Sequence, residues 1–156
     1  MNNTTLIRTI TVLGGVLVLA AINYSIYAKE QIKRHGDVIY LELAPVDPRS
    51  LMQGDYMALR FAVTNDIARQ HTGKPFVQLE LDSRRVARVP EAGAPGTVRV
   101  RYRMRNGQVW LGTNAYFFEE GAGPQFTPAR YGKFRLDTRS GEAVLVALCD
   151  DQLKEL

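Results

Sequence analysis

The sequence predicts a mainly β protein, with an N-terminal transmembrane helix followed by a small antiparallel β-sandwich or partly open β-barrel domain that contains one short helix. Two observations lead to this expectation. Residues 9–28 contain no charged side chain and are apolar around the whole helix circumference. After residue 36, apolar and polar residues alternate in short runs separated by turn residues, as in half-buried strands. A chain of 156 residues suits one modest domain plus this appendage.

The uncharged segment 9–28 has the length of a membrane span, because about 20 helical residues rise by roughly 30 Å. Tyr24 and Tyr27 suit an aromatic belt where the helix leaves the bilayer. A signal-peptide cleavage site requires small residues, and these bulky tyrosines do not match that pattern. We therefore favour an uncleaved single-pass signal anchor over a cleaved signal peptide or a buried core helix. Residues 1–8 form a tail before it, and residues 29–36 extend the helix until Gly36 stops it.

Residues 37–156 are expected to form the β-rich soluble domain. Asn106-Gly107 favours a type I′ turn between two of its strands. One short helix is expected over residues 64–70, capped by Thr64 or Asn65. The strands are expected at residues 38–43, 55–63, 76–81, 85–89, 98–105, 108–118, 130–136 and 142–148.

A proline bend, a Gly-Asp turn and a strand follow one another within residues 44–61. Pro45 and Pro48 have fixed φ angles, and Gly54 can adopt positive φ. The alternation after Gly54 divides the side chains between two faces. The core face is expected to carry Met57, Leu59, Phe61 and Val63, and the opposite face Tyr56, Ala58 and Arg60.

This stretch carries a family resemblance: Gly54-Asp55-Tyr56-x-x-Leu59-x-Phe61 resembles the motif of the membrane-anchored bacterial proteins named for GDYxxLxY. Residues 45–49, 116–121 and 129–132 also look similar to that family. Phe61 stands where the motif ends in tyrosine, and its predicted core position means that a hydroxyl there is not indispensable. The family has no established activity, so the resemblance implies architecture and location only.

Two indications about location oppose each other. The resemblance implies an N-terminal signal anchor with the soluble domain outside the cytoplasmic membrane. The positive-inside rule favours the other orientation, because Lys29, Lys33 and Arg34 outnumber Arg8 at the opposite end. We expect an inner-membrane protein with an extracytoplasmic domain. The single Cys149 is compatible with either compartment and suggests a buried core residue.

Arginines occupy every second position of one expected strand, so one of its faces is wholly guanidinium. This face could bind anionic lipid, a polyanionic polymer or an acidic partner. The alternative is a solvated sheet face whose arginines pair with Gln78, Glu80 and Asp82 on another strand. A balance of 20 basic against 16 acidic side chains does not indicate a nucleic-acid binder. The arginines are Arg99, Arg101, Arg103 and Arg105.

A binding surface of tyrosine, arginine and carboxylate side chains is the second candidate, since Tyr and Arg often anchor interfaces. Its alternative is structural, with the proline bend folding over Tyr56. The candidate binding residues are Tyr56, Arg60, Asp47, Arg49, Asp55, Tyr116, Arg130 and Tyr131, and Phe118 belongs to the same aromatic set.

Catalysis is the least supported class. Ser50 with Asp55 could serve a membrane-tethered peptidase or hydrolase, but no general base stands in a suitable context. His35 and His71 are isolated in the sequence, so no metal site is predicted. No catalytic residue and no cofactor is predicted either. The favoured function is a non-catalytic binding or accessory module at the bacterial cell envelope, associated with a multi-pass membrane protein.

Overall fold

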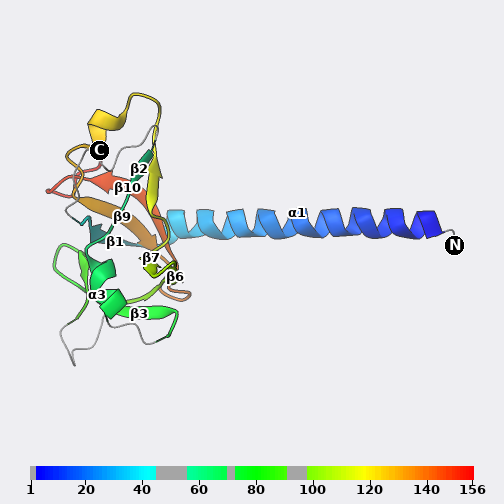
Figure 1. Cartoon of the computed structure of the whole chain (residues 1–156), viewed down its shortest axis with the longest axis horizontal. Coiled ribbons are helices and arrows are strands. Elements are labelled where there is room, and N and C mark those ends of the chain that lie inside the picture. Colours follow the sequence, from blue (N-terminus) through cyan, green and yellow to red (C-terminus); the bar gives the residue numbers. More distant parts are fainter. Residues whose placement is uncertain (1–2, 45–55, 70–72, 91–97) are drawn as a thin grey trace.

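A computed structural model describes residues 3–44, 56–69, 73–90 and 98–156 of the chain. In these residues a long N-terminal helix projects from a domain built of small antiparallel sheets (Figure 1). The predicted fold class is confirmed: the domain is mainly β with one short α-helix, and the described strands do not close into a barrel.

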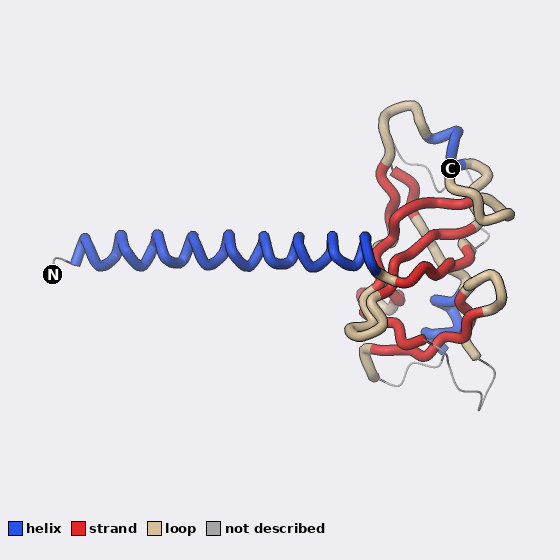
Figure 2. Tube along the Cα trace, turned by 180° about the vertical axis from the view of Figure 1, so that it is seen from behind, coloured by secondary structure: helices blue, strands red, loops and turns tan. Residues whose placement is uncertain are grey.

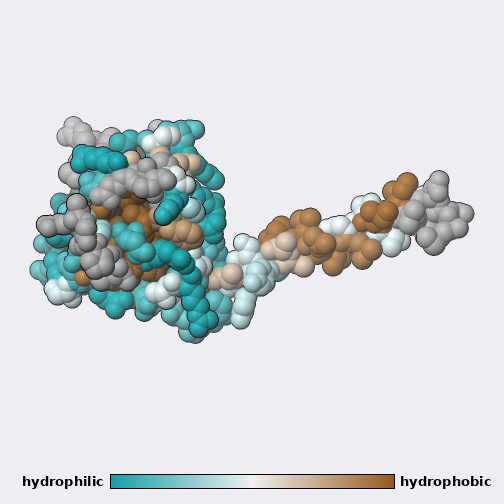
Figure 3. Space-filling view, turned by 90° about the horizontal axis from the view of Figure 1, so that it is seen from below, coloured by the Kyte–Doolittle hydropathy of each residue, from teal (hydrophilic) through white to brown (hydrophobic). Residues whose placement is uncertain are grey.

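Helix α1 (Asn3–His35) stands clear of the domain over most of its length (Figure 2). Every side chain from Ile7 to Tyr27 is exposed, and hydrophobic residues cover much of this length in Figure 3. The helix is long and apolar enough to cross a membrane, and none of its most apolar window is buried in the protein. A buried core helix is therefore excluded, since the domain offers this segment no apolar cover.

Helix α1 ends at His35, one residue before the predicted stop at Gly36. The Gly36 N–H donates to the Ile32 carbonyl at 2.8 Å. A Cβ at Gly36 would lie only 2.6 Å from that oxygen and close to the backbone of Leu136, so the close approach requires glycine. Ile32 itself is buried, and the last turns of α1 contact β9 (Tyr131–Leu136) and β10 (Ala143–Cys149).

The central sheet has the order β1-β9-β10, with β1 spanning Asp37–Glu42. Both neighbours of β9 run antiparallel to it. A second sheet has the order β4-β3-β5, and two ribbons, β2-β8 and β6-β7, complete the described strands. The remaining strands are β2 (Tyr56–Ala58), β3 (Phe76–Leu81), β4 (Ala87–Arg88), β5 (Val98–Arg101), β6 (Arg103–Arg105), β7 (Gln108–Trp110) and β8 (Ala115–Phe117).

The core forms where the central sheet meets the segment after β2. Phe61 is 1% exposed and packs edge-on against Phe134, with ring centres 5.3 Å apart. Gly132 makes room for this pair, because a Cβ there would approach the Phe61 ring to 2.9 Å. Met57, Leu59, Phe61 and Val63 are all buried, which confirms the predicted core face.

The strand predicted over residues 55–63 is too long, because regular pairing ends at Ala58. Phe61 still forms a bridge to Leu43, and helix α3 (Val63–Arg69) begins two residues later. Neither predicted cap is observed as such: Thr64 and Asn65 lie inside α3, and the Thr64 hydroxyl donates to the Phe61 carbonyl at 2.6 Å. A 3₁₀ turn, η1 (Gly123–Phe126), lies between the strands predicted over residues 108–118 and 130–136.

Two further predicted strands are interrupted, and the strand predicted over residues 85–89 begins only at Ala87. Residues 98–105 split into β5 and β6 at Tyr102, and residues 108–118 split into β7 and β8. The second break contains Gly112, whose φ is +73° and whose Cβ would lie 2.7 Å from the Ala143 carbonyl. Arg85 has φ of 64° and belongs to the turn before β4. The Asn106-Gly107 turn is confirmed, with φ of 50° and 74°.

Candidate functional site

The β2–β8 ribbon presents an aromatic pair on its outer face. Tyr56 is the cross-strand partner of Phe117, and their ring centres lie 5.7 Å apart. Phe117 is 73% exposed, whereas Tyr56 is partly buried. Figures 1 and 2 both place the ribbon at the side of the domain from which α1 emerges. We call Tyr56 and Phe117 the aromatic pair.

The inner face of the same ribbon holds this pair in place. Tyr116 packs edge-on against Phe126 at 5.2 Å, and Phe118 stacks on the same ring at 5.3 Å. Because residues 116 and 118 share one face of the strand, residue 117 must point the other way. Tyr116, a predicted binding residue, therefore packs into the domain. Phe117 is exposed but is not among the predicted binding residues, although strict alternation from Tyr116 could have identified it.

Arg60 lies two residues beyond the end of β2, at a small pocket beside α3. The pocket has a volume of about 120 Å³. Within the described part of the chain, Asn114 Oδ1 is a buried atom without a hydrogen-bond partner, and Asn114 also lines this pocket. Such an arrangement suits a small polar group, since pockets for organic ligands usually exceed about 300 Å³. The other polar lining residues are Thr64, Asn65 and Gln108.

Arg130 and Tyr131 lie at the start of β9, away from both features. The Arg130 N–H donates to the Cys149 carbonyl at 2.8 Å, and its own carbonyl accepts from Leu43 N–H at 2.8 Å. The Arg84 guanidinium lies 5.9 Å from the centre of the Tyr131 ring. These contacts join three segments of the domain. Among the described residues, the binding candidates therefore have different surroundings: Arg60 lines the small pocket, Tyr116 packs on Phe126, and Arg130 and Tyr131 lie at the start of β9.

The arginine row, defined as Arg99, Arg101, Arg103 and Arg105, is exposed on β5 and β6 as the alternation predicts. Of the three alternative partners only Gln78 lies opposite an arginine of the row, and the pairing with Glu80 and Asp82 does not occur. Arg99 faces Gln78 and Arg101 faces Phe76, whereas Glu80 faces Arg88. In the ranges that the structure describes, none of the four arginines forms a salt bridge.

Aromatic rings take the place of carboxylates beside the arginine row. The Arg99 and Arg101 guanidinium carbons lie 4.6 and 6.0 Å from the centre of the Phe76 ring. Arg105 lies 5.2 Å from the centre of the Trp110 ring. Such cation–π contacts orient a guanidinium without neutralising it, so the positive charge stays available to solvent and ligands.

Two grooves flank the last turns of α1. One, of about 400 Å³, lies between α1 and β10 and includes Ile26, Lys29, Val144 and Val146. The other, of about 650 Å³, lies against the turn between β9 and β10. Lys29 forms an ion pair with Glu142 between them, which ties the helix to the domain.

Three groups outside these surfaces have shifted pKa values. Burial raises the pKa of the Cys149 thiol to about 11. A hydrogen bond to Glu155 at 2.5 Å raises the pKa of Lys133 and holds the C-terminal segment on β9. The Ser140 hydroxyl donates to Asp137 at 2.6 Å and lowers the pKa of that carboxyl. All three shifts have structural causes and none points to catalysis.

Several predicted residues lie outside the described residues: Pro45, Asp47, Pro48, Arg49, Ser50, Gly54 and Asp55. The hydrolase hypothesis for Ser50 and Asp55, and the predicted proline bend, therefore concern residues outside the described ranges. In the described ranges no three His, Cys, Asp or Glu side chains come together in a way that could hold a metal ion.

Comparison with known proteins gives one match. A family model described as GDYXXLXY protein matches residues 18–148, which includes the C-terminal half of α1 and nearly all of the β domain. No curated protein and no solved structure matches the chain.

Proposed function

The chain belongs to the GDYXXLXY family, and from this premise we propose that it is a single-pass, membrane-anchored binding module at the bacterial cell envelope. In this proposal α1 crosses the cytoplasmic membrane as an uncleaved anchor and the β domain lies on the extracytoplasmic side. The domain has no catalytic role and binds a multi-pass membrane protein. The exposed apolar length of α1 supports the anchoring, because such a surface is stable only when lipid or protein covers it.

One observation carries the binding part of the proposal: the exposed Phe117 packs against Tyr56 on a ribbon whose inner face is anchored in the domain. Large aromatic side chains on rigid supports are typical anchors of protein interfaces, because they bury much area and lose little conformational entropy. Phe117 is 73% exposed, so a partner that covers its ring would remove a large apolar area from water, which favours binding.

The position of the pair supports a membrane protein as the partner. The ribbon lies at the α1 side of the domain (Figures 1 and 2), and the groove between Ile26 and Val146 lies beside the same helix. Ile26 falls inside the uncharged segment 9–28, so this groove reaches the depth of the predicted bilayer. A partner with its own membrane-spanning helices could therefore contact α1, the groove and the aromatic pair together.

Photo-crosslinking in intact membranes tests the binding proposal. A photoreactive amino acid at Phe117 should form an adduct with an integral membrane protein, and the same group at the exposed Asn65 of α3 should not. Tyr56→Ala should reduce the Phe117 adduct roughly tenfold, because loss of an interface anchor commonly costs more than 1 kcal/mol. Adducts with lipid alone, or equal adducts from both positions, would contradict a protein partner.

A reporter fused after Leu156 tests the location. A reporter that is active only outside the cytoplasm should be active, and one that fluoresces only in the cytoplasm should stay dark. Alkaline carbonate should leave the chain in the membrane fraction. Release by carbonate, or activity of the cytoplasmic reporter, would reject the anchored extracytoplasmic arrangement.

A further inference from the structure

We propose that the arginine row binds the anionic head groups of the bilayer in which α1 is anchored, and so holds the β domain in one orientation against the membrane surface. The partner is the phospholipid surface itself. The proposal rests on the membrane anchoring above but is independent of any protein partner.

The backbone places the arginine row at the level where α1 leaves its apolar segment. Lys29 is the first charged residue after residues 9–28, and it forms an ion pair with Glu142. The Arg101 N–H donates to the carbonyl of Gly141, the residue before Glu142, at 2.7 Å. These two contacts therefore connect β5 to the end of α1 that leaves the apolar segment.

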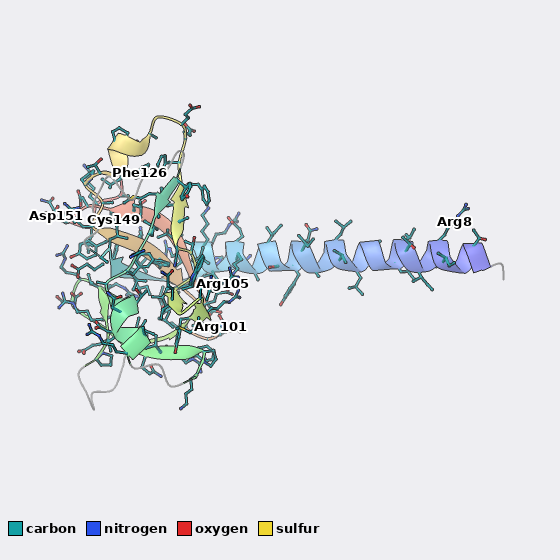
Figure 4. All side chains as sticks on the ribbon, viewed as in Figure 1. Arg8, Arg101, Arg105, Phe126, Cys149 and Asp151 are labelled. Atoms are coloured by element: carbon teal, nitrogen blue, oxygen red, sulfur yellow. The ribbon has the colours of Figure 1, made fainter. Side chains whose placement is uncertain are left out.

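Electrostatics and the side-chain view agree with this placement. Burial lowers the pKa of the Lys29 ammonium, and the nearby positive charges of Arg103 and Arg101 lower it further, which is consistent with these three cations lying near one another. Figure 4 shows Arg101 and Arg105 at the side of the domain from which α1 projects. A bilayer that contains residues 9–28 has its head groups at this level, because the span of about 30 Å ends there.

The arginine row is organised to bind an external anion. Arg99, Arg101 and Arg105 contact the rings of Phe76 and Trp110, and Arg99 also donates to the Arg139 carbonyl at 2.8 Å. Within the described residues, no carboxylate compensates the charge of these three arginines. Two arginines elsewhere on the domain differ in this respect: Arg69 and Arg88 each face an intramolecular carboxylate. Guanidinium groups bind phosphate oxygens bidentately, so lipid phosphates match the chemistry of the arginine row.

The experiment uses the full chain reconstituted in nanodiscs, labelled with a dye at Gln108→Cys. Gln108 is exposed and pairs with Arg105 across the β6–β7 ribbon, and Cys149 is fully buried and stays unlabelled. A nitroxide on the lipid head groups reports proximity by quenching. Quenching should be about twofold stronger with about a third of phosphatidylglycerol than in pure phosphatidylcholine. It should fall to the phosphatidylcholine value between about 0.05 and 0.5 M salt.

Matched variants separate the arginine row from net charge. R101Q/R105Q should lose the dependence on phosphatidylglycerol, whereas R69Q/R88Q removes the same charge and should keep it. R101K/R105K should retain part of the salt-sensitive quenching, which would show that the ribbon still folds with substitutions at both positions. Unchanged quenching of R101Q/R105Q, or equal loss in R69Q/R88Q, would overturn the proposal.

Two further measurements distinguish lipid from a soluble anion, and a failure of membrane anchoring from a failure of head-group binding. Inorganic phosphate should reverse the quenching no better than sodium chloride of equal ionic strength; reversal at low concentration would overturn lipid binding in favour of a soluble anion. Failure of the chain to incorporate into phosphatidylcholine discs would overturn the anchoring itself. Incorporation without any dependence on phosphatidylglycerol would overturn the head-group contact alone.

Discussion

Phe61→Ala should strongly destabilise the domain, because this ring joins the segment after β2 to the central sheet. Phe61 is 1% exposed, packs edge-on against Phe134 at 5.3 Å, and lies over Gly132. Burial of such a ring contributes about 1.5–3 kcal/mol, and the aromatic contact adds about 0.5–1.5 kcal/mol. With the cavity that remains, we expect a loss of about 3–5 kcal/mol in the free energy of unfolding.

Urea unfolding of the full chain in detergent measures this loss. The single tryptophan, Trp110, provides the fluorescence signal and lies outside the mutated contact. With an m-value of about 1–3 kcal/mol per molar urea, the midpoint should fall by roughly 1–4 M. A domain of this size unfolds with about 5–15 kcal/mol, so the variant should be close to the limit of folding.

Phe117→Ala is the matched control, since it makes the same substitution on a neighbouring element. Phe117 is 73% exposed, so the expected change in unfolding free energy is below about 1 kcal/mol. The two variants should therefore separate stability from binding: Phe61→Ala strongly lowers the free energy of unfolding, and Phe117→Ala leaves it nearly unchanged. Equal midpoints for the two variants would refute the assignment of Phe61 to the core and Phe117 to the surface.

Two pH-linked predictions concern Asp137 and Cys149. The lowered pKa of Asp137 contributes stability above the ordinary carboxyl pKa of 3.8, and this is lost as pH falls through the lowered value. Ser140→Ala should raise that pKa, followed by NMR titration, while Thr138→Ala in the same turn should not; no change with Ser140→Ala would contradict the hydrogen bond. Cys149, with a pKa of about 11, should not react with a thiol reagent at about pH 8 until the domain unfolds. Rapid labelling of the native chain would show that the thiol is accessible.

Local patterns were sufficient for several elements. The uncharged segment predicted the long exposed helix and its end beside Gly36, because helix length and a terminating glycine are local properties. Alternation predicted β3 over Phe76–Leu81 without error and placed Met57, Leu59 and Phe61 in the core. The Asn106-Gly107 dipeptide predicted its turn for the same reason.

Contacts between distant residues decided where strands stop. Nothing near Gly112 in the sequence indicates that the Ala143 carbonyl lies 2.7 Å from its missing Cβ, yet this approach breaks the predicted strand 108–118. The register of β3 with β5 likewise places Phe76, and no carboxylate, opposite Arg101. A shift of two residues would have placed Glu80 opposite Arg99, and only tertiary packing selects the register.

The sequence by itself determined the family, the apolar helix, the mainly β class and the two faces of the key strand, because these depend on composition and on periods of 2 and 3.6 residues. The tertiary structure alone decided where the described binding candidates lie, that Tyr56 packs against Phe117, and that the arginine row lies beside the helix exit. The physical reason is that a surface depends on which distant segments pack side by side, and residues 29, 101 and 142 meet only after the sheets have formed.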